Sequence, residues 1–462
     1  MTIHSFSSLP LSEVFLNNLN RLGYQQMTPI QAQSLPLILD RRDVIAQAKT
    51  GSGKTAAFGI GLLHSLNPAS FAIQGLVLCP TRELADQVAK ELRRLACATD
   101  NIKILTLCGG APMRPQMSSL EHGAHIVVGT PGRIRDHIER KSIDLTRIRM
   151  LVLDEADRML DMGFQEEIAG IINECPRDRQ TLLFSATYPD TIRKISARYL
   201  KNPIEVKLES QHAASQIEQR FYEISPSHRN AAVAALLNHY KPVSTLAFCN
   251  TKVQCRELAA DLQAQGFSAL ALYGELEQRE RDQILVQFAN QSCSVLVATD
   301  VAARGLDIQT LNAVINVDVS KDTEVHIHRI GRTGRGTDKG LALNLCAPNE
   351  MRFVNLIEDY QKKPVEWFSL PPAMPKEQQA LQAPMVTLSI LGGKRDKLRP
   401  GDILGGFTGE GGMEGANIGK INIFEFVTFV AIKRSVAKAC FSQLCNAKIK
   451  GKNFKMRYLI EF

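Results

Sequence analysis

A short apolar stretch runs into small residues and a lysine, a pattern that could bind phosphate. Residues 44–46 favour a strand, and an apolar helical pattern follows Thr55. Between them, backbone N–H groups of small residues can turn toward phosphate oxygens, Lys54 adds positive charge, and the Thr55 hydroxyl can ligate Mg²⁺. This spacing predicts a P-loop for a nucleoside triphosphate, formed by Ala48, Lys49, Thr50, Gly51, Ser52, Gly53, Lys54 and Thr55.

An acidic cluster follows another apolar strand. Asp154 and Glu155 come directly after residues 151–153. We expect Asp154 to hold the Mg²⁺ and Glu155 to orient and deprotonate an attacking water. The alternative is an acidic helix N-terminus that the helix dipole stabilises. A P-loop in the same chain favours the catalytic interpretation.

The second half of the chain supplies a cluster of arginines. Arg329, Arg332 and Arg335 lie within seven residues. Arg332 and Arg335 are three residues apart, so a helical turn would place them on one face. Two guanidinium groups could stabilise charge on a transferred phosphoryl group as arginine fingers, and the alternative is a basic surface turn.

Short apolar strands that alternate with helical patterns must position these groups. Such strands are typical of a parallel sheet covered on both faces, and ligands bind at the carboxyl ends of its strands. The expected strands are residues 44–46, 76–79, 126–128, 151–153 and 182–184, then 246–248, 269–272, 295–297, 314–317 and 341–345.

In order along the chain, the motifs resemble those of the DEAD-box ATP-dependent RNA helicases of superfamily two, over about residues 6–350. The resemblance implies an α/β fold with two RecA-like, doubly wound parallel-sheet domains in tandem. It implies ATP and Mg²⁺ as cofactors and RNA as partner. ATP and RNA would both favour the joined form of the two domains, so each would tighten binding of the other.

The resemblance also assigns site residues. Lys54, Glu155, Arg332 and Arg335 would be catalytic, and Thr55 and Asp154 would hold the metal. Gln31 would read the adenine edge, Phe6 would stack on its ring, and Tyr24 belongs to the same motif. Gly305 and Asp307 would contact the nucleotide. The residues that couple hydrolysis to RNA opening would be Asp157, Ser185, Thr187 and His328.

The family's RNA contacts can be carried over in the same way. They are groups that grip phosphates and 2′-hydroxyls, so we expect a core indifferent to RNA sequence. One departure is His326, where the family usually has an aromatic residue. The positions are Pro80, Thr81, Arg82, Gly109, Gly110, Thr130, Pro131, Gly132, Arg133, Asn250, Gln278, Arg281 and Thr299.

Residues 385–462 hold most of the excess positive charge. Of the net charge of +8, this segment carries +7 and residues 1–384 only +1. Such a block indicates a polyanionic partner, most often nucleic acid. The expected element order, βαββαβ, is that of an RNA-recognition motif.

This segment resembles the RNA-binding domain of the DbpA family of bacterial helicases. The resemblance implies a hairpin of large-subunit (23S) ribosomal RNA as target and a role in assembly of large ribosomal subunit precursors. Phe424, Phe426 and Phe429 cannot all face one side of a sheet, so at least one should be core. The expected phosphate contacts are Lys394, Arg395, Lys397 and Arg399.

The expected organisation is three domains. They are a first RecA-like domain at 1–208, a second at 209–370 and an RNA-recognition-motif-like α+β domain at 385–462, and a linker at 371–384 joins the second to the third. The ten cysteines lack zinc-like spacing and indicate free thiols. No apolar run could span a membrane and no secretory signal is visible, so we expect a cytoplasmic protein without membrane contact. No long amphipathic stripe predicts a dimer, so a monomer is expected.

Four alternatives stay open. The protein could be an ATP-dependent RNA clamp that serves as an assembly scaffold, or a general RNA helicase without preference for ribosomal RNA. It could also be a DNA translocase of the same superfamily, which the Asp-Glu-Ala-Asp string disfavours. The basic C-terminal segment could dock a protein instead of RNA, and steep salt dependence would distinguish RNA binding.

Overall fold

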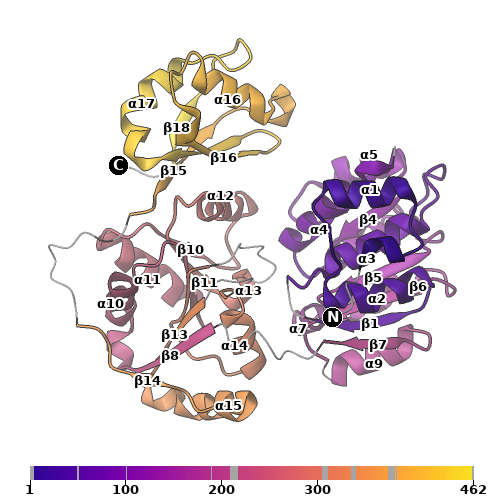
Figure 1. Cartoon of the computed structure of the whole chain (residues 1–462), viewed down its shortest axis with the longest axis horizontal. Helices are drawn as coiled ribbons and strands as arrows, with labels where there is room; N and C mark the ends of the chain where they lie inside the picture. The colour runs from indigo at the N-terminus through magenta and orange to yellow at the C-terminus, as the bar shows by residue number, and fades with distance from the viewer. Residues whose placement is uncertain are drawn as a thin grey trace. The chain divides into compact units, whose positions relative to one another are not determined.

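The structure is a computed structural model that describes residues 5–48, 51–99, 101–188, 190–208, 217–303, 311–334, 340–372, 380 and 382–459. Its contacts divide the described chain into two compact units, one through residue 208 and one from residue 217 onward. The first unit holds one parallel sheet. The second holds another parallel sheet and the C-terminal antiparallel sheet (Figure 1).

The first sheet has seven strands in the order β3-β4-β2-β5-β6-β1-β7, and every pairing in it is parallel. Its strands are β1 Val44–Gln47, β2 Gly75–Leu78, β3 Ile104–Leu107, β4 Ile126–Gly129, β5 Met150–Asp154, β6 Gln180–Ser185 and β7 Ile204–Lys207. The helices are α1 Glu13–Arg21, α2 Pro29–Leu39, α3 Lys54–Ser65, α4 Arg82–Leu95, α5 Met113–Glu121, α6 Pro131–Glu139, α7 Ala156–Asp161, α8 Gln165–Asn173 and α9 Asp190–Tyr199.

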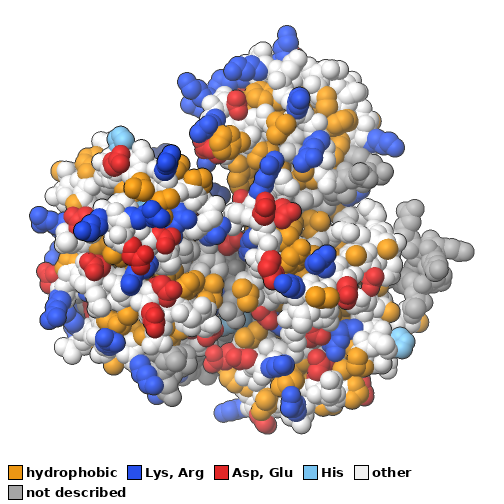
Figure 2. Space-filling view, turned by 180° about the vertical axis from the view of Figure 1, so that it is seen from behind, with side chains coloured by type: hydrophobic (Ala, Val, Ile, Leu, Met, Phe, Trp, Pro, Cys, Tyr) orange, Lys and Arg blue, Asp and Glu red, His pale blue; other side chains and the backbone are white. Residues whose placement is uncertain are grey.

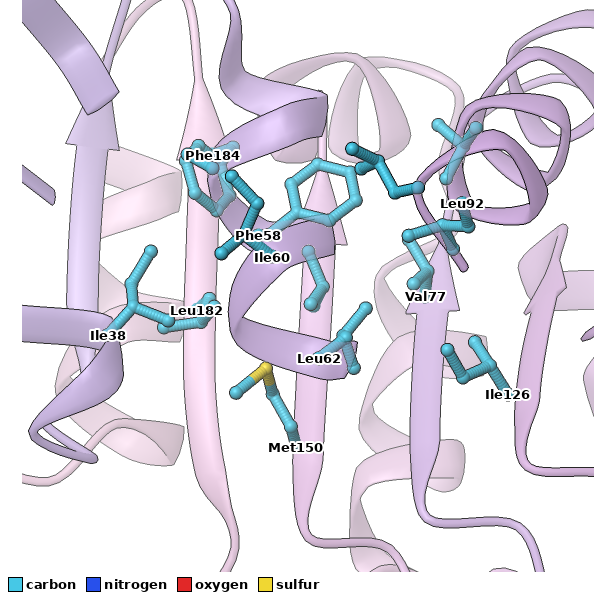
Figure 3. Close-up of a cluster of buried hydrophobic side chains, with 14 of the residues drawn as sticks. Ile38, Phe58, Ile60, Leu62, Val77, Leu92, Ile126, Met150, Leu182 and Phe184 are labelled. Atoms are coloured by element: carbon cyan, nitrogen blue, oxygen red, sulfur yellow. The ribbon is translucent and has the colours of Figure 1, made fainter. Parts of the chain in front are cut away.

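Alternation along the strands explains why helices cover both faces of this sheet. Val152 packs into one hydrophobic cluster, whereas its neighbours Leu151 and Leu153 pack into another. Figure 3 shows the first cluster, in which Phe58 of α3 lies against Phe184 of β6 with ring centroids 5.3 Å apart. The buried sheet gives the loops at its carboxyl edge a rigid base.

The second parallel sheet also has seven strands, in the order β10-β11-β9-β12-β13-β8-β14. These are β8 Ile217–Glu223, β9 Thr245–Cys249, β10 Ala269–Leu272, β11 Val295–Thr299, β12 Ala313–Asn316, β13 Gly340–Cys346 and β14 Trp367–Phe368. Its helices are α10 Arg229–Tyr240, α11 Lys252–Ala264, α12 Gln278–Ala289, α13 Asp300–Ala303, α14 Thr323–Ile330 and α15 Met351–Gln361.

The C-terminal sheet has four antiparallel strands in the order β16-β17-β15-β18. The elements are β15 Met385–Ile390, α16 Pro400–Thr408, β16 Ile418–Ile423, β17 Thr428–Lys433, α17 Arg434–Asn446 and β18 Met456–Tyr458. Figure 1 shows α16 and α17 on one side of the sheet, where Phe407 and Leu444 pack against Leu388 and Val430. The observed order is βαββαβ.

These features confirm the predicted fold class. Each of the ten expected strands coincides with an observed strand, and the order βαββαβ of the C-terminal domain is as predicted. The prediction that at least one of Phe424, Phe426 and Phe429 is core is confirmed by Phe429, which has 1% of its surface exposed. The four strands that were not predicted are β3, β7, β8 and β14. Among the described residues, no helix combines the length and apolar character needed to cross a membrane.

Candidate nucleotide and RNA site

The P-loop connects β1 to α3 at the carboxyl edge of the first sheet. Gly51 and Gly53 have φ of +82° and +96°, in the left-handed region that glycine adopts without a steric cost. A Cβ at Gly53 would also lie 2.5 Å from Gln31 Nε2. Lys54 is buried, and its ammonium donates to the Ala48 carbonyl at 2.8 Å. Ser52 and Thr55 lie in the described part of the loop, whereas Lys49 and Thr50 lie outside the described residues.

Gln31 joins the P-loop to the preceding motif. Its Oε1 accepts the Thr28 backbone N–H at 2.9 Å, and its Nε2 donates to the Gly53 carbonyl at 3.1 Å. The side chain is 2% exposed, so its carboxamide is engaged by protein groups here. Phe6 is also buried and meets Tyr24 edge-on, with centroids 6.1 Å apart. Their adenine-binding roles therefore stay predictions.

Asp154 ends β5 close to the P-loop lysine. Burial raises the pKa of Asp154 to about 7, against the opposing charge of Lys54 and with the repulsion of Glu155. Its Oδ1 is buried and has no hydrogen-bond partner among the described residues. An oxygen without a partner beside phosphate-binding groups fits a Mg²⁺ that takes most of its other ligands from phosphate and water.

Glu155 is held in an unusual backbone conformation. Its φ is +53°, which is uncommon for a residue with a side chain, and such strain clusters at functional sites. Its Oε2 lies 2.7 Å from Arg158 Nη1, and both side chains are buried. The ion pair orients the carboxylate that we predicted as the general base.

Asp157 links the acidic motif to β6. Its Oδ2 accepts the backbone N–H groups of Ala186 and Thr187 at 3.1 and 3.0 Å, and the Thr187 hydroxyl at 2.9 Å. Burial favours the protonated acid, but hydrogen bonds from Thr187 and the charge of Lys54 lower the pKa of Asp157 overall. The Ser185 carbonyl accepts the Ala48 N–H at 3.0 Å. The predicted coupling residues of this unit thus contact both the acidic motif and the P-loop strand.

The predicted RNA contacts of the first unit follow β2, β3 and β4. Thr81, after Pro80, caps α4 by accepting the Leu84 N–H, and Thr130 precedes Pro131 and Gly132 at the start of α6. Gly110 has a φ of +74°, and a Cβ there would overlap the guanidinium of Arg82, which also lies near Gly109. Arg133 Nη1 donates to the Ala111 carbonyl at 2.9 Å. These loops meet at one end of neighbouring strands.

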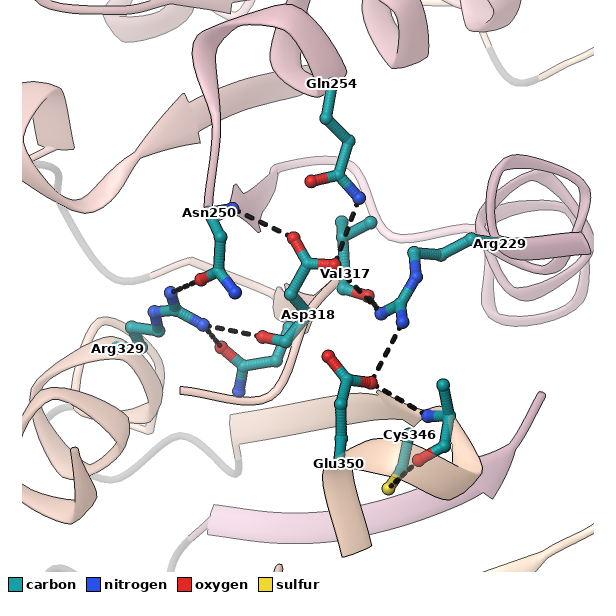
Figure 4. A network of polar contacts seen from close by, with 10 residues as sticks. Arg229, Asn250, Gln254, Val317, Asp318, Arg329, Cys346 and Glu350 are labelled. Carbon is teal, nitrogen blue, oxygen red and sulfur yellow. Dashed lines mark hydrogen bonds and ion pairs between the residues drawn. The ribbon is translucent and has the colours of Figure 1, made fainter. Parts of the chain in front are cut away.

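A polar network organises the equivalent edge of the second sheet (Figure 4). Arg329 is 2% exposed and forms two bonds with Asp300, at 2.7 and 2.6 Å. The same guanidinium donates to Asn250 Oδ1 at 3.1 Å and to the Asp318 carbonyl at 2.8 Å. Asn250, a predicted RNA contact, is therefore oriented by a buried arginine.

The network continues through the carboxylate of Asp318. Its Oδ2 accepts the Asn250 backbone N–H at 2.9 Å, and its Oδ1 lies 3.0 Å from Arg229 Nη1. Arg229 Nη2 also pairs with Glu350 at 2.9 Å. Sequence reasoning gave no role to Arg229, Asp318 or Arg329. Asp318 had a detectable pattern, because it follows directly on an expected strand, 314–317.

The arginine-finger segment differs in part from the expectation. Helix α14 ends at Ile330 with Gly331 as its C-cap, so Arg332 lies beyond the helix. Arg332 therefore does not lie on a regular helix, because the chain leaves α14 at Gly331, and its placement on one face with Arg335 stays a prediction. Arg332 is buried, at 5% exposure, and His328 is half-buried within α14. Arg335, Gly305 and Asp307 lie outside the described residues.

The remaining predicted RNA contacts of the second unit lie on α12 and β11. Gln278 is the first residue of α12 and donates to Asp282 at 2.9 Å. Arg281 Nη2 donates to the Ala302 carbonyl at 3.1 Å, and Thr299 ends β11. Arg281 thus ties α12 to the segment after β11, at the same sheet edge as Asn250.

A basic surface lies on the C-terminal domain, and we define it as Lys394, Arg395, Lys397 and Arg399. All four residues are exposed. The backbone N–H groups of Lys394 and Arg395 donate to the carbonyls of Phe424 and Glu425, at 2.8 and 3.1 Å. Figure 2 shows Lys and Arg side chains gathered over the C-terminal domain on the face in view. This basic surface is therefore fastened to the turn between β16 and β17.

The same turn carries an exposed aromatic ring. Phe426 is 61% exposed, and the Arg395 guanidinium lies 4.6 Å from the centre of its ring. On the outer face of the sheet, by contrast, Thr387, Ser389 and Phe429 are buried. Thr387 Oγ1 lies 2.7 Å from Ser292 Oγ, and Asn422 Nδ2 donates to Asn290 Oδ1 at 3.0 Å. A ring that could stack on a base is thus available at the turn and not at Phe429.

Comparison with known proteins agrees with this geometry. The DEAD/DEAH box helicase family matches residues 28–195, the helicase conserved C-terminal domain matches 228–337, and the DbpA RNA binding domain matches 387–458. The chain is 51% identical over 456 residues to the ATP-dependent RNA helicase DbpA of Escherichia coli (strain K12), covering 98% of this chain and 99% of that protein.

More distant relatives share the helicase core. The ATP-dependent RNA helicase CshA of Listeria monocytogenes is 41% identical, over 79% of this chain and 70% of that protein. The solved structure of S. cerevisiae Dbp5 bound to RNA and ADP BeF3 matches with a TM-score of 0.72 and 30% identity, over 79% of this chain and 96% of the other. The chain therefore belongs to the DEAD-box ATP-dependent RNA helicases, which are RNA-stimulated ATPases, and it carries a DbpA-type RNA-binding domain.

Proposed function

We propose that this helicase remodels large-subunit (23S) ribosomal RNA during assembly of the large ribosomal subunit, and that its C-terminal domain selects the RNA. The observation that carries the proposal is the exposed basic surface beside Phe426. Lysine and arginine side chains bind phosphates, while an exposed ring can stack on an unpaired base. The resemblance to DbpA over nearly the whole chain supports ribosomal RNA as the target.

We also propose that Mg²⁺ accompanies ATP at the P-loop. Asp154, whose Oδ1 has no hydrogen-bond partner among the described residues, and Thr55 would hold the ion, and the ion would neutralise phosphate charge. Lys54 would bind the β- and γ-phosphates, and Glu155 would take a proton from the attacking water. Arg332 and Arg335 would stabilise charge on the transferred phosphoryl group. The buried Glu155–Arg158 pair supports a carboxylate held ready in one orientation.

The RNA-contacting and coupling roles follow from the same arrangement. Asp157 contacts Thr187, so a change at the acidic motif can reach β6 directly. In the second unit, Arg329 and Asp318 orient Asn250. We propose domain limits at residues 208 and 370, with the RNA-binding domain from 385. We further propose a monomer that acts in the cytoplasm, where its ribosomal target is assembled.

The test is ATP hydrolysis by the full chain with three RNAs: a fragment of large-subunit ribosomal RNA, a transfer RNA and a homopolymer. The key variant changes Lys394, Arg395, Lys397 and Arg399 to Gln. A matched control changes Lys433, Lys438, Lys448 and Lys452, four exposed lysines elsewhere in the same domain, to Gln. We expect the ribosomal fragment to stimulate wild type and control most strongly, and the key variant to lose this preference.

Two further readouts separate the alternatives. Loss of four phosphate contacts should also flatten the salt dependence of RNA binding, by roughly three to four in the log–log slope. Displacement of a strand from a tailed duplex distinguishes a helicase from a clamp, which would hydrolyse ATP without releasing the strand. Equal stimulation by all three RNAs, unchanged in the key variant, would contradict selection by this surface.

A further inference from the structure

A second concentration of positive charge lies in the first unit, at the edge of the sheet opposite the P-loop. A pocket of about 460 Å³ opens there, and it is lined by Arg41, Arg42, Arg147, Arg149, Arg179 and Lys201. Asp43 precedes β1, Arg149 precedes β5 and Arg179 precedes β6, so the pocket lies at the amino ends of these strands. The predicted nucleotide and RNA contacts of this unit follow the carboxyl ends. This pocket therefore belongs to neither site.

The pocket is built on a fixed backbone. The Asp43 carboxylate accepts the Thr181 N–H at 2.8 Å and the Lys201 N–H at 2.7 Å, which fastens the start of β6 and the loop before β7 to the residue before β1. Gln180 Nε2 donates to the Arg42 carbonyl at 2.7 Å. Because β5, β6, β1 and β7 are consecutive in the sheet, these loops converge at one place.

The cations of the pocket are poorly neutralised. Within the described chain, the side chains of Arg41, Arg42, Arg147, Arg149 and Lys201 form no hydrogen bond and no ion pair within 4 Å, although the charge of Arg147 acts on nearby Asp144. Two carboxylates also line the pocket, Asp43 and Asp178, but both oxygens of Asp43 already accept backbone N–H groups. The lining therefore presents a large excess of donors and positive charge over acceptors.

Arg179 adds an independent observation. It is 9% exposed, and its Nη1 donates to the Pro176 carbonyl at 2.8 Å. Its Nε is buried and has no partner among the described residues. A buried donor without an acceptor costs stability, so its persistence in the lining of a cationic pocket indicates a missing anion.

We propose that this pocket binds phosphate groups, and in particular a small anion with two or more of them. Guanidinium forks match phosphate geometry and carry charge at every physiological pH, and several forks around one hollow suit a multiply charged ligand. The volume is within the range of roughly 300–1,000 Å³ of small-molecule sites. The phosphates can come from a free oligophosphate or from an RNA backbone that passes over the pocket.

The test uses the full chain with ADP saturating the P-loop, and it measures binding of inorganic tripolyphosphate by calorimetry. The pocket variant is Arg42→Gln with Arg149→Gln, since both side chains are exposed and neither makes a hydrogen bond in the described structure. The matched control is Arg21→Gln with Arg140→Gln, two exposed arginines of the same unit outside the pocket. Equal melting temperatures of the three proteins establish that each is folded.

We expect one tripolyphosphate to bind beyond the P-loop, with affinity about tenfold or more weaker in the pocket variant and unchanged in the control. Affinity for single-stranded RNA then separates the two sources. If it also falls in the pocket variant, the pocket binds the RNA backbone. If it is unchanged, the ligand is a free oligophosphate. The proposal is overturned if no tripolyphosphate binds to the ADP-saturated protein, or if the pocket variant binds it as tightly as wild type.

Discussion

Asp157 and Thr187 are joined by two hydrogen bonds, since Asp157 Oδ2 accepts both the backbone N–H and the hydroxyl of Thr187, at 3.0 and 2.9 Å. Asp157 belongs to the motif that ends β5, and Thr187 follows β6. The two strands are neighbours in the sheet, and β6 also pairs with the strand before the P-loop. A displacement of the acidic motif during ATP hydrolysis would therefore move the segment after β6 with it.

Thr187→Val tests this connection. The substitution keeps the shape of the side chain and the backbone N–H groups of Ala186 and Thr187 that donate to Asp157. It removes only the hydrogen bond from the Thr187 hydroxyl, worth about 1 kcal/mol, roughly a factor of five in an equilibrium. We expect strand displacement to fall by about that factor while RNA-stimulated ATP hydrolysis changes less. The ratio of strands released to ATP hydrolysed measures the difference.

Thr408→Val is the matched control for this experiment. Thr408 also donates its hydroxyl, to the Leu404 carbonyl at 2.8 Å, but on the exposed surface. The ratio should stay at the wild-type value in this control. If Thr187→Val left the ratio unchanged too, Asp157 and Thr187 would be structural neighbours only.

Arg329→Lys should lower the free energy of unfolding of the second unit. Lysine cannot reproduce the planar fork that serves Asp300, Asn250 and the Asp318 carbonyl together, so it leaves buried acceptors unpaired. Breaking a buried ion pair costs about 3 kcal/mol. Chemical denaturation of the full chain, followed by probes in each unit, should show a loss in the second unit alone. Arg256→Lys, an exposed position on α11, should have no effect, and a loss of the same size there would refute the assignment.

The sequence predicted the central strands well, and the reason is burial. Nine of the ten expected strands of the two parallel sheets lie inside a sheet, and all ten read as nearly continuous apolar runs. The strands that were missed are mostly at or near the edges: β3 ends one side of the first sheet, β7 ends the other, and β14 ends the second. Edge strands meet solvent on one side, so residues 204–207 (Ile-Glu-Val-Lys) mix apolar and charged side chains.

The site was predictable where function fixes residue type, and less so where it depends on tertiary contacts. The P-loop and Asp154 lie together because their strands end at one sheet edge. The contacts of Arg329 with Asp300 and Asn250 join three separate segments, and no local pattern encodes them. The pocket at the opposite edge is likewise assembled from four loops, and no local sequence pattern marks the arginine or lysine that each loop contributes.

Asp154 should make the nucleotide-free protein less stable as pH rises. Burial raises its pKa in the folded state to about 7, above the unfolded value of about 4. The folded state therefore binds more protons between these values, and stability present below pH 4 is lost as pH rises through 7. Between pH 5 and pH 8, this carboxyl should lower the free energy of unfolding of the wild-type protein by about 2–4 kcal/mol, and Asp154→Asn should lack that loss. Urea denaturation at the two pH values measures it.

The control for Asp154→Asn is Asp40→Asn, because Asp40 is an exposed carboxylate of the same unit. This variant should keep the wild-type difference between pH 5 and pH 8. At pH 8 the Asp154→Asn protein should be more stable than wild type while binding Mg²⁺·nucleotide more weakly. An unaltered pH difference in Asp154→Asn would mean that this carboxylate is ionised throughout.

His326 lies at a position where the helicase family usually has an aromatic residue. Unlike Asp154, it should make the protein less stable as pH falls. It is 1% exposed, and its Nε2 lies 3.1 Å from Gln219 Oε1. Burial, and to a smaller extent Arg329, lowers its pKa to about 3, so the imidazole stays neutral in the folded state. An unfolded imidazole takes up a proton near pH 6.5, so stability present above that pH is lost as pH falls toward 3.

His326→Phe should remove this sensitivity, because a phenyl ring cannot bind a proton and can still pack near Phe221, whose ring lies 6.3 Å from the imidazole. Loss of the Gln219 contact should lower stability at pH 7.5 in the variant. The difference between pH 7.5 and pH 5 should nevertheless shrink by about 2 kcal/mol. His122→Phe, at an exposed position, should leave that difference intact. An equal acid loss in His326→Phe and wild type would show that His326 is protonated in the folded protein, and that the buried Nδ1 then has an acceptor.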